Sequence, residues 1–198
     1  MSRQQRHHAQ DALAQETARL ICEERITDYR SAKHKALQRL GLGPHTPLPD
    51  NLRVRDAVIE YQRLFGGARY VAHLDALRRA AVQAMTLLAS FQPQLVGGAV
   101  SGAVTLAHRA QLHAFAERPE SLELFLQNRG IAVRQQERSY RYPDGREQSI
   151  PLVCLEAGGV GLDIAVFDHD GLRRIPLDPV EGTPYRRFDL AAVQALMR

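Results

Sequence analysis

The first half of the chain carries apolar residues at the spacing of amphipathic helices. Residues 9–42 predict two helices, the second of which the pair Thr27-Asp28 can cap. A third helix is predicted over residues 51–65 and a long fourth helix over residues 70–91, because apolar residues recur every three or four positions in both. We therefore expect this half of the chain to be helical.

Beyond Pro93 the pattern changes to an alternation of apolar and polar residues, which is typical of strands. Strands are predicted over residues 94–96, 110–116, 131–142, 149–156 and 160–167. Helices are predicted over residues 119–129 and 189–197, with a short one after the first strand. This order predicts an α+β protein, with a helical region over residues 1–92 and, over residues 93–198, a mixed sheet with helices packed on one face.

The composition is that of a globular protein, with 44% hydrophobic and 24% charged residues among 198. No apolar run approaches the roughly 20 residues that cross a bilayer, and the N-terminus lacks the apolar core of a secretory signal. We therefore expect no membrane contact and a cytoplasmic location. The two cysteines, Cys22 and Cys154, exclude a disulfide framework. The net charge of +4 comes almost entirely from arginine and points weakly to a nucleotide or nucleic acid partner.

A glycine-rich turn follows the first predicted strand. It contains Gly97, Gly98, Ser101 and Gly102, at the predicted start of the short helix. Backbone N–H groups at a helix start attract phosphate oxygens, and glycine allows those oxygens to approach closely. These four residues are therefore candidate phosphate ligands. The alternative is a tight turn between strand and helix that binds no ligand.

Polar residues lie on one face of two predicted strands. In residues 110–116, Gln111 and His113 alternate with apolar residues, and in residues 160–167 Asp163 points away from the apolar face. If the two strands are neighbours, these three side chains line one cleft as candidate catalytic residues. The alternatives are an Asp163 that faces solvent or pairs with an arginine, and a His113 that is packed.

The order of these elements over residues 90–170 resembles the nucleotidyltransferase superfamily that includes DNA polymerase beta. In that superfamily a glycine pair follows the first core strand, an acid-any-acid pair lies on the second strand, and a third acid lies on a later strand. Gly97-Gly98 matches the first element, and Asp163 between Leu162 and Ile164 matches the third. The resemblance implies a nucleotidyltransferase-like fold, a nucleoside triphosphate or nucleic acid ligand, and Mg²⁺ bound by Asp163.

The acidic pair of the second strand is missing from its expected positions. Arg109 and Gln111, or Gln111 and His113, stand there instead. Two-metal phosphoryl transfer needs several oxygen ligands around Mg²⁺, and one aspartate cannot supply them. We therefore expect that the chain does not carry out ordinary two-metal catalysis, although it keeps the fold and the phosphate-binding glycine turn.

Other side chains could complete a metal site. The nearest carboxylates in sequence, which would have to fold back from strand ends, are Glu117, Asp168 and Asp170. A histidine set suited to a softer transition metal would be His108, His113 and His169.

The whole chain also resembles a group of bacterial proteins that join a similar helical half to a nucleotidyltransferase-like remainder. The segments that carry this second resemblance are Asp28-Tyr29-Arg30-Ser31-Ala32-Lys33, Arg39-Leu40-Gly41, Leu112-His113-Ala114-Phe115-Ala116 and Leu172-Arg173-Arg174. Arg173 and Arg174, like the pair Arg186-Arg187, could bind phosphate or an RNA backbone through paired hydrogen bonds. The alternative for both pairs is a solvated charged surface.

Three functions follow from these observations. The first is a degenerate nucleotidyltransferase-like protein that binds a nucleotide or nucleic acid phosphate, with Asp163 as its sole surviving acid. The second is an active metal-dependent enzyme acting on RNA, protein or a small molecule, in which another carboxylate or His113 joins Asp163. The third is a helical interaction module, such as a homodimer, with a vestigial cleft.

Overall fold

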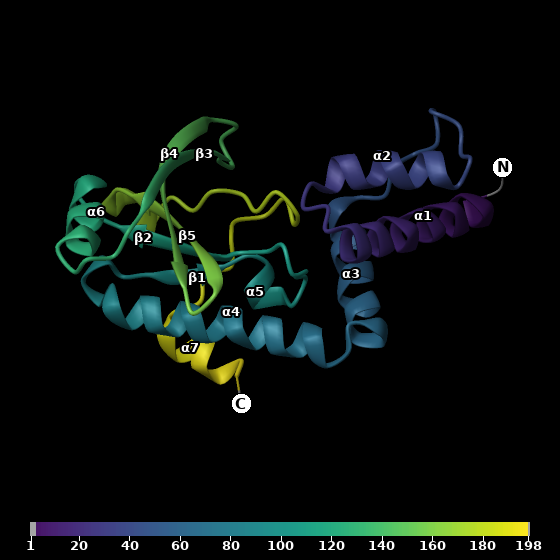
Figure 1. Ribbon diagram of the computed structural model, residues 1–198. Coiled ribbons are helices and arrows are strands. Elements are labelled where there is room, and N and C mark those ends of the chain that lie inside the picture. The colour runs from purple at the N-terminus through teal and green to yellow at the C-terminus, as the bar shows by residue number, and fades with distance from the viewer. Residues whose placement is uncertain (1–2, 198) are drawn as a thin grey trace. The chain divides into compact units, whose positions relative to one another are not determined.

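The computed structural model describes residues 3–197 and divides the chain into two compact units. The first comprises Met1–His73 with Gly102–His108, and the second comprises Leu74–Ser101 with Arg109–Arg198. Helices and a five-stranded mixed sheet are both present, which confirms the α+β class (Figure 1). The domain boundary predicted after residue 92 falls within the second unit.

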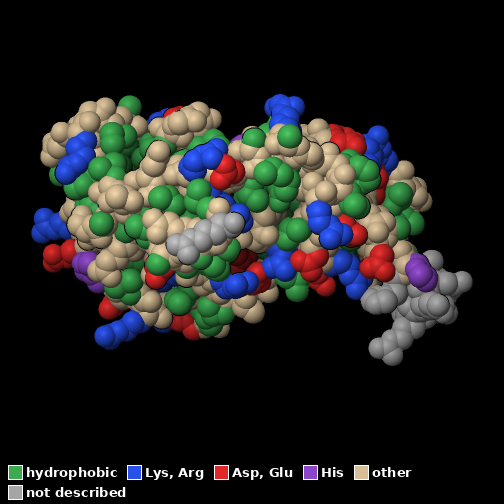
Figure 2. Space-filling model, turned by 90° about the horizontal axis from the view of Figure 1, so that it is seen from below, with side chains coloured by type: hydrophobic (Ala, Val, Ile, Leu, Met, Phe, Trp, Pro, Cys, Tyr) green, Lys and Arg blue, Asp and Glu red, His purple; other side chains and the backbone are tan. Residues whose placement is uncertain are grey.

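Charged side chains of both signs are scattered over one face of the molecule, among hydrophobic and other side chains (Figure 2). Over the face drawn in Figure 2, Lys and Arg side chains (blue) are interspersed with Asp and Glu side chains (red) and do not gather in one patch. None of the helices in residues 3–197 is long and apolar enough to cross a membrane.

The first unit is helical. Its helices are α1 (Arg3–Glu24), α2 (Tyr29–Arg39), α3 (Asn51–Phe65) and the first turns of α4 (Gly67–Leu87). Asp28 caps α2 by accepting a hydrogen bond from the Ser31 amide, as the sequence predicts, and Asp50 caps α3 in the same way. The buried residues of one core cluster in this unit are Ala18, Ile21, Ala32, Val54, Val58 and Ala103.

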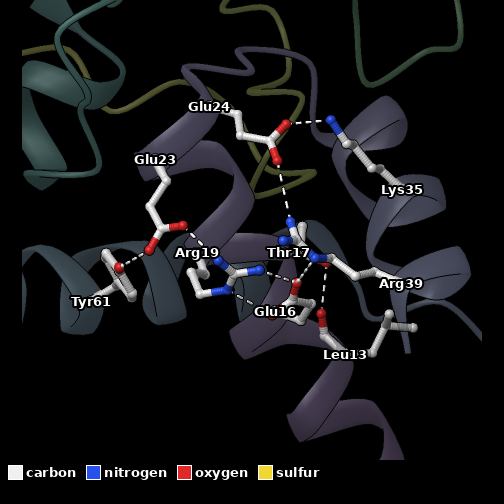
Figure 3. Close-up of polar contacts among 9 residues, drawn as sticks. All are labelled: Leu13, Glu16, Thr17, Arg19, Glu23, Glu24, Lys35, Arg39 and Tyr61. Atoms are coloured by element: carbon white, nitrogen blue, oxygen red, sulfur yellow. Dashed lines mark hydrogen bonds and ion pairs between the residues drawn. The ribbon is translucent and has the colours of Figure 1, made fainter. Parts of the chain in front are cut away.

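Ion pairs and a hydrogen bond link the first three helices at their surface (Figure 3). Within α1, Arg19 bridges Glu16 and Glu23, and the Tyr61 hydroxyl of α3 donates to Glu23 at 2.7 Å. Glu24, near the end of α1, pairs with Lys35 and Arg39 of α2. Such surface pairs contribute little stability each, so the apolar core contributes most of the stability of this unit.

The sheet of the second unit has the order β1-β2-β5-β4-β3. Its strands are β1 (Gln94–Val96), β2 (Ala110–Phe115), β3 (Arg134–Arg141), β4 (Glu147–Ala157) and β5 (Val160–Phe167). β2 and β5 are parallel, and every other neighbouring pair is antiparallel. The remaining elements are η1 (Ala89–Phe91), α5 (Gly98–Ser101), α6 (Glu120–Gln127), η2 (His169–Leu172) and α7 (Leu190–Ala195).

Strand β5 lies between β2 and β4 and is buried along its whole length. On one of its faces Ile164 is completely buried, and Figure 1 shows α4 running along one side of the sheet. On the other face, Phe167 packs with Tyr185 of the chain that follows η2. That chain returns to the sheet edge, where Phe188 and Leu95 exchange backbone hydrogen bonds. The second face of β5 thus has an aromatic cover.

Candidate functional site

The strand register places the three sequence elements side by side. Val96 of β1 pairs with Gln111 of β2, and Gln111 pairs with Asp163 of β5. Gly97 follows Val96 directly. Strands β2 and β5 are therefore the neighbours that a shared cleft requires, and Gln111 and Asp163 lie on the same face.

The turn after β1 depends on glycine for two reasons. Gly97 has φ +72°, a conformation that L side chains rarely adopt. A Cβ at this position would also lie 3.0 Å from Oε1 of Gln111. The helix that follows, α5, has only four residues, and Gly102 is counted with the first unit. Gly97, Gly98 and Ser101 lie in this turn and helix, and Gly102 follows Ser101 directly in the chain.

We expect Gly97→Ala to lower the free energy of unfolding by about 1–2 kcal/mol, the usual cost of a left-handed conformation for a residue with a Cβ. Urea denaturation of the two proteins measures this difference. Gly145→Ala is a control, because Gly145 also has a positive φ of 84° but a Cβ added there would have nothing within 4 Å. An unchanged stability in Gly97→Ala would contradict the turn geometry.

Asp163 is held by two arginines. Its carboxylate Oδ1 accepts a hydrogen bond from Nε of Arg109 at 2.6 Å, and its Oδ2 accepts one from Nη2 of Arg138 at 3.1 Å. The side chain of Asp163 is only 11% exposed. The arginine-paired alternative predicted for this aspartate is therefore the arrangement found.

Arg109 is anchored at each of its guanidinium nitrogens. Besides Asp163, it donates to Glu156 at 2.5 Å and to the carbonyl oxygens of Leu155 and Leu162. Burial alone would lower the pKa of Arg109, but the hydrogen bonds to the two carboxylates raise it above its ordinary value. Gly161 makes this packing feasible, because a Cβ there would overlap Nη1 of Arg109.

His113 is packed inside an aromatic cluster. Only 1% of it is exposed, and its ring centroid lies 4.7 Å from that of Phe167, 4.9 Å from that of Tyr185 and 5.5 Å from that of Tyr140. Its Nδ1 accepts a hydrogen bond from Nε of Arg187 at 3.1 Å. Burial, together with the charges of nearby arginines, holds the pKa of His113 well below its usual range, so the ring is neutral at pH 7.

The side chains around Asp163 do not form a site suited to Mg²⁺. Both of its carboxylate oxygens already carry guanidinium groups, whose positive charge opposes a divalent cation. Within residues 3–197, no three His, Cys, Asp or Glu side chains form a group that could hold a metal ion. Asp168 caps η2 by accepting from the Gly171 amide, and Glu117 and Asp170 are exposed. His108 belongs to the first unit, where its Nδ1 contacts Thr105.

Of two further arginines in this region, the sequence indicated Arg187 only as part of the pair Arg186-Arg187 and did not indicate Arg138. Arg138 lies on β3 and reaches Asp163 across β4, and Arg187 reaches His113 from the chain after η2. Arg173 and Arg174, which the sequence indicated as phosphate ligands, are exposed, and Arg174 lies 5.3 Å from the ring of Tyr142. The sequence singled out Arg138 only as a member of the predicted strand over residues 131–142.

The site on this face of the sheet is rich in positive charge. Two arginines, Arg109 and Arg138, pair with the carboxylates of Asp163 and Glu156, and a third, Arg187, contacts His113 instead of a carboxylate. Arginine binds oxyanions through paired, charge-assisted hydrogen bonds. No known protein family matches this sequence, and no match is found among curated proteins.

Proposed function

We propose that the second unit is a nucleotidyltransferase-like domain that binds the phosphate of a nucleotide or nucleic acid and does not carry out ordinary two-metal transfer. The observation that carries this proposal is the pairing of both Asp163 oxygens with arginine. Guanidinium groups stand where divalent cations would have to bind. The same groups attract phosphate oxygens.

The arrangement of the strands supports the proposed relationship. The glycine turn directly follows Val96 of β1, which pairs with Gln111 of β2. Gln111 in turn pairs with Asp163 of β5, the strand parallel to β2. This is the order of elements that the superfamily resemblance implies. The arginines supply the electrostatic part of phosphate binding that Mg²⁺ would otherwise provide.

Arg138 is the arginine best able to exchange its partner. Arg109 is fixed by two carboxylates and two carbonyl oxygens, whereas Arg138 touches Asp163 at 3.1 Å and is 33% exposed in its side chain. A ligand phosphate can compete with Asp163 for Arg138 at little structural cost. Arg109 would meanwhile keep Asp163 in place.

A thermal-shift series tests the proposal. We expect at least one of ATP, GTP, CTP and UTP to raise the melting temperature without added Mg²⁺ or Mn²⁺, by about 2–4 °C for each kcal/mol of binding linkage. Asp163→Asn should retain or enlarge this shift, measured against its own ligand-free protein, because Arg138 loses a competing carboxylate. Asp170→Asn, at an exposed acid of the same unit, is the matched control.

Other outcomes would favour the other functions. A strict requirement for Mg²⁺ or Mn²⁺ that Asp163→Asn abolishes would support an active enzyme with a rearranged metal site. No shift with any nucleotide, together with a stable dimer, would support the helical interaction module. The exposed apolar residues Leu64, Phe65 and Val71 give that module a surface in the first unit.

A further inference from the structure

Two buried nitrogen atoms next to the aromatic cluster lack hydrogen-bond partners. They are Nε2 of His113 and Nη2 of Arg187, and neither has a partner among residues 3–197. Buried polar atoms in folded proteins are almost always paired with protein, water or ligand. These two atoms therefore indicate a group that approaches both side chains.

The missing partner has to be a hydrogen-bond acceptor. Nδ1 of His113 accepts from Nε of Arg187, so it carries no hydrogen, and in a neutral ring the hydrogen is then on Nε2. Nη2 of a guanidinium is a donor as well. Two buried donors that face no acceptor call for an oxygen with lone pairs.

The charge of Arg187 favours an anion as that acceptor. Its Nη1 donates to the Gly171 carbonyl at 2.7 Å, and its guanidinium lies 5.0 Å from the Phe115 ring and 5.5 Å from the Phe167 ring. Its contacts within the described chain include no carboxylate. Burial lowers the pKa of Arg187 to about 10, which leaves it charged at neutral pH. A partly buried cation without a counter-ion is costly, and an anionic ligand reduces that cost.

Arg138 supplies a second cation on the same side of the sheet. Its charge contributes to the lowered pKa of His113, and it lies beside Tyr140 and Asp163. Arg138 and Arg187 are both partly exposed, so this group of side chains reaches the protein surface. Arg138 and Arg187 therefore both lie close to His113.

We infer that Arg138, His113 and Arg187 form an oxyanion subsite that takes one phosphate group, the terminal phosphate of a nucleotide or free inorganic phosphate. Because both nitrogens are buried, they favour a small oxyanion over the larger base or ribose. The nucleotide part of this inference rests on the proposed function, whereas the phosphate part rests on these three side chains. The phosphate would thus bind at these side chains and not at the glycine turn that the sequence predicted.

The test titrates the full-length protein with inorganic phosphate, ATP and adenosine by calorimetry in a phosphate-free buffer. Wild-type protein should bind phosphate and ATP but not adenosine. Arg187→Gln and Arg138→Gln should each weaken both by about tenfold or more, as expected for loss of a charge-assisted contact. Arg186→Gln, at an exposed neighbour of Arg187, should change binding by less than about twofold.

A second measurement does not depend on the variants folding. Phosphate should shift the Nε2 resonance of His113 in a ¹H–¹⁵N spectrum of the imidazole groups, with the Nε2-protonated tautomer retained. An unchanged resonance at saturating phosphate would mean that water satisfies both donors and would overturn the inference. A shift that adenosine also produces would overturn it too.

The outcomes separate this inference from the proposed function. ATP binding that Arg138→Gln and Arg187→Gln leave unchanged would overturn the subsite and leave nucleotide binding intact. Binding of phosphate through the two arginines, without tighter binding of any nucleotide, would support the subsite and refute nucleotide recognition. Failure of both ligands to bind would refute both.

Discussion

Phe167→Ala is expected to lower the free energy of unfolding by about 3–5 kcal/mol, the usual cost of removing a buried aromatic side chain. Phe167 is 2% exposed on β5. Its ring centroid lies 4.7 Å from that of His113, 5.2 Å from that of Tyr140 and 6.1 Å from that of Phe115. Alanine would leave a cavity beneath the aromatic cluster, and urea denaturation followed by circular dichroism measures the loss.

The control for this substitution is Leu124→Ala in the same unit. Leu124 is 56% exposed on α6, so its truncation should change stability by no more than about 0.5 kcal/mol. A loss below about 1 kcal/mol in Phe167→Ala would show that the aromatic cluster is not packed as described. Because the ring also supports His113 and Arg187, we expect the same variant to weaken phosphate binding.

Arg109→Met should destabilise the protein by about 2–3 kcal/mol, the range for a lost charged hydrogen bond at a partly buried site. The substitution leaves Oδ1 of Asp163, a residue that is 8% exposed, without its donor at 2.6 Å. Adding Asp163→Asn to Arg109→Met should cost less than the two single losses together, since the two residues share one contact. Denaturation of both single variants and the double variant gives this coupling energy.

Two further variants isolate the cause. Gly161→Ala keeps every charge but puts a Cβ against the Arg109 guanidinium, so it should lower stability in the same direction. Arg118→Met removes an arginine at an exposed position and should change stability by no more than about 0.5 kcal/mol. Equal losses of stability in Arg109→Met and Arg118→Met would mean that the contact between Arg109 and Asp163 contributes nothing to stability.

The helices were predicted well because their signals are local. Asp28 caps α2 through the Ser31 amide three residues on, and the apolar spacing of residues 51–65 coincides with α3. The strand alternation also located β2 and β5 closely, since each has a continuous apolar face. α4 begins at Gly67, three residues before the predicted start, because its first turn has no distinctive capping residue.

The contacts of the site could not be predicted in the same way. Arg109 and Arg138 lie 54 and 25 residues from Asp163 in sequence, and only the strand register brings them together. Periodicity shows which face a side chain occupies but not which strand lies beside it. For the same reason the sequence indicated that Asp163 could pair with an arginine and could not say which one.

The bare backbone of Gly161 has a consequence for any attempt to introduce magnesium binding by design. Placing a carboxylate at position 111 would leave Arg109 lying across β5 and Arg138 on the second oxygen of Asp163. Each of these side chains would repel the incoming ion. Binding of Mg²⁺ at Asp163 would need both guanidinium groups removed and the space above Gly161 filled by another side chain. No single substitution therefore makes this surface bind magnesium.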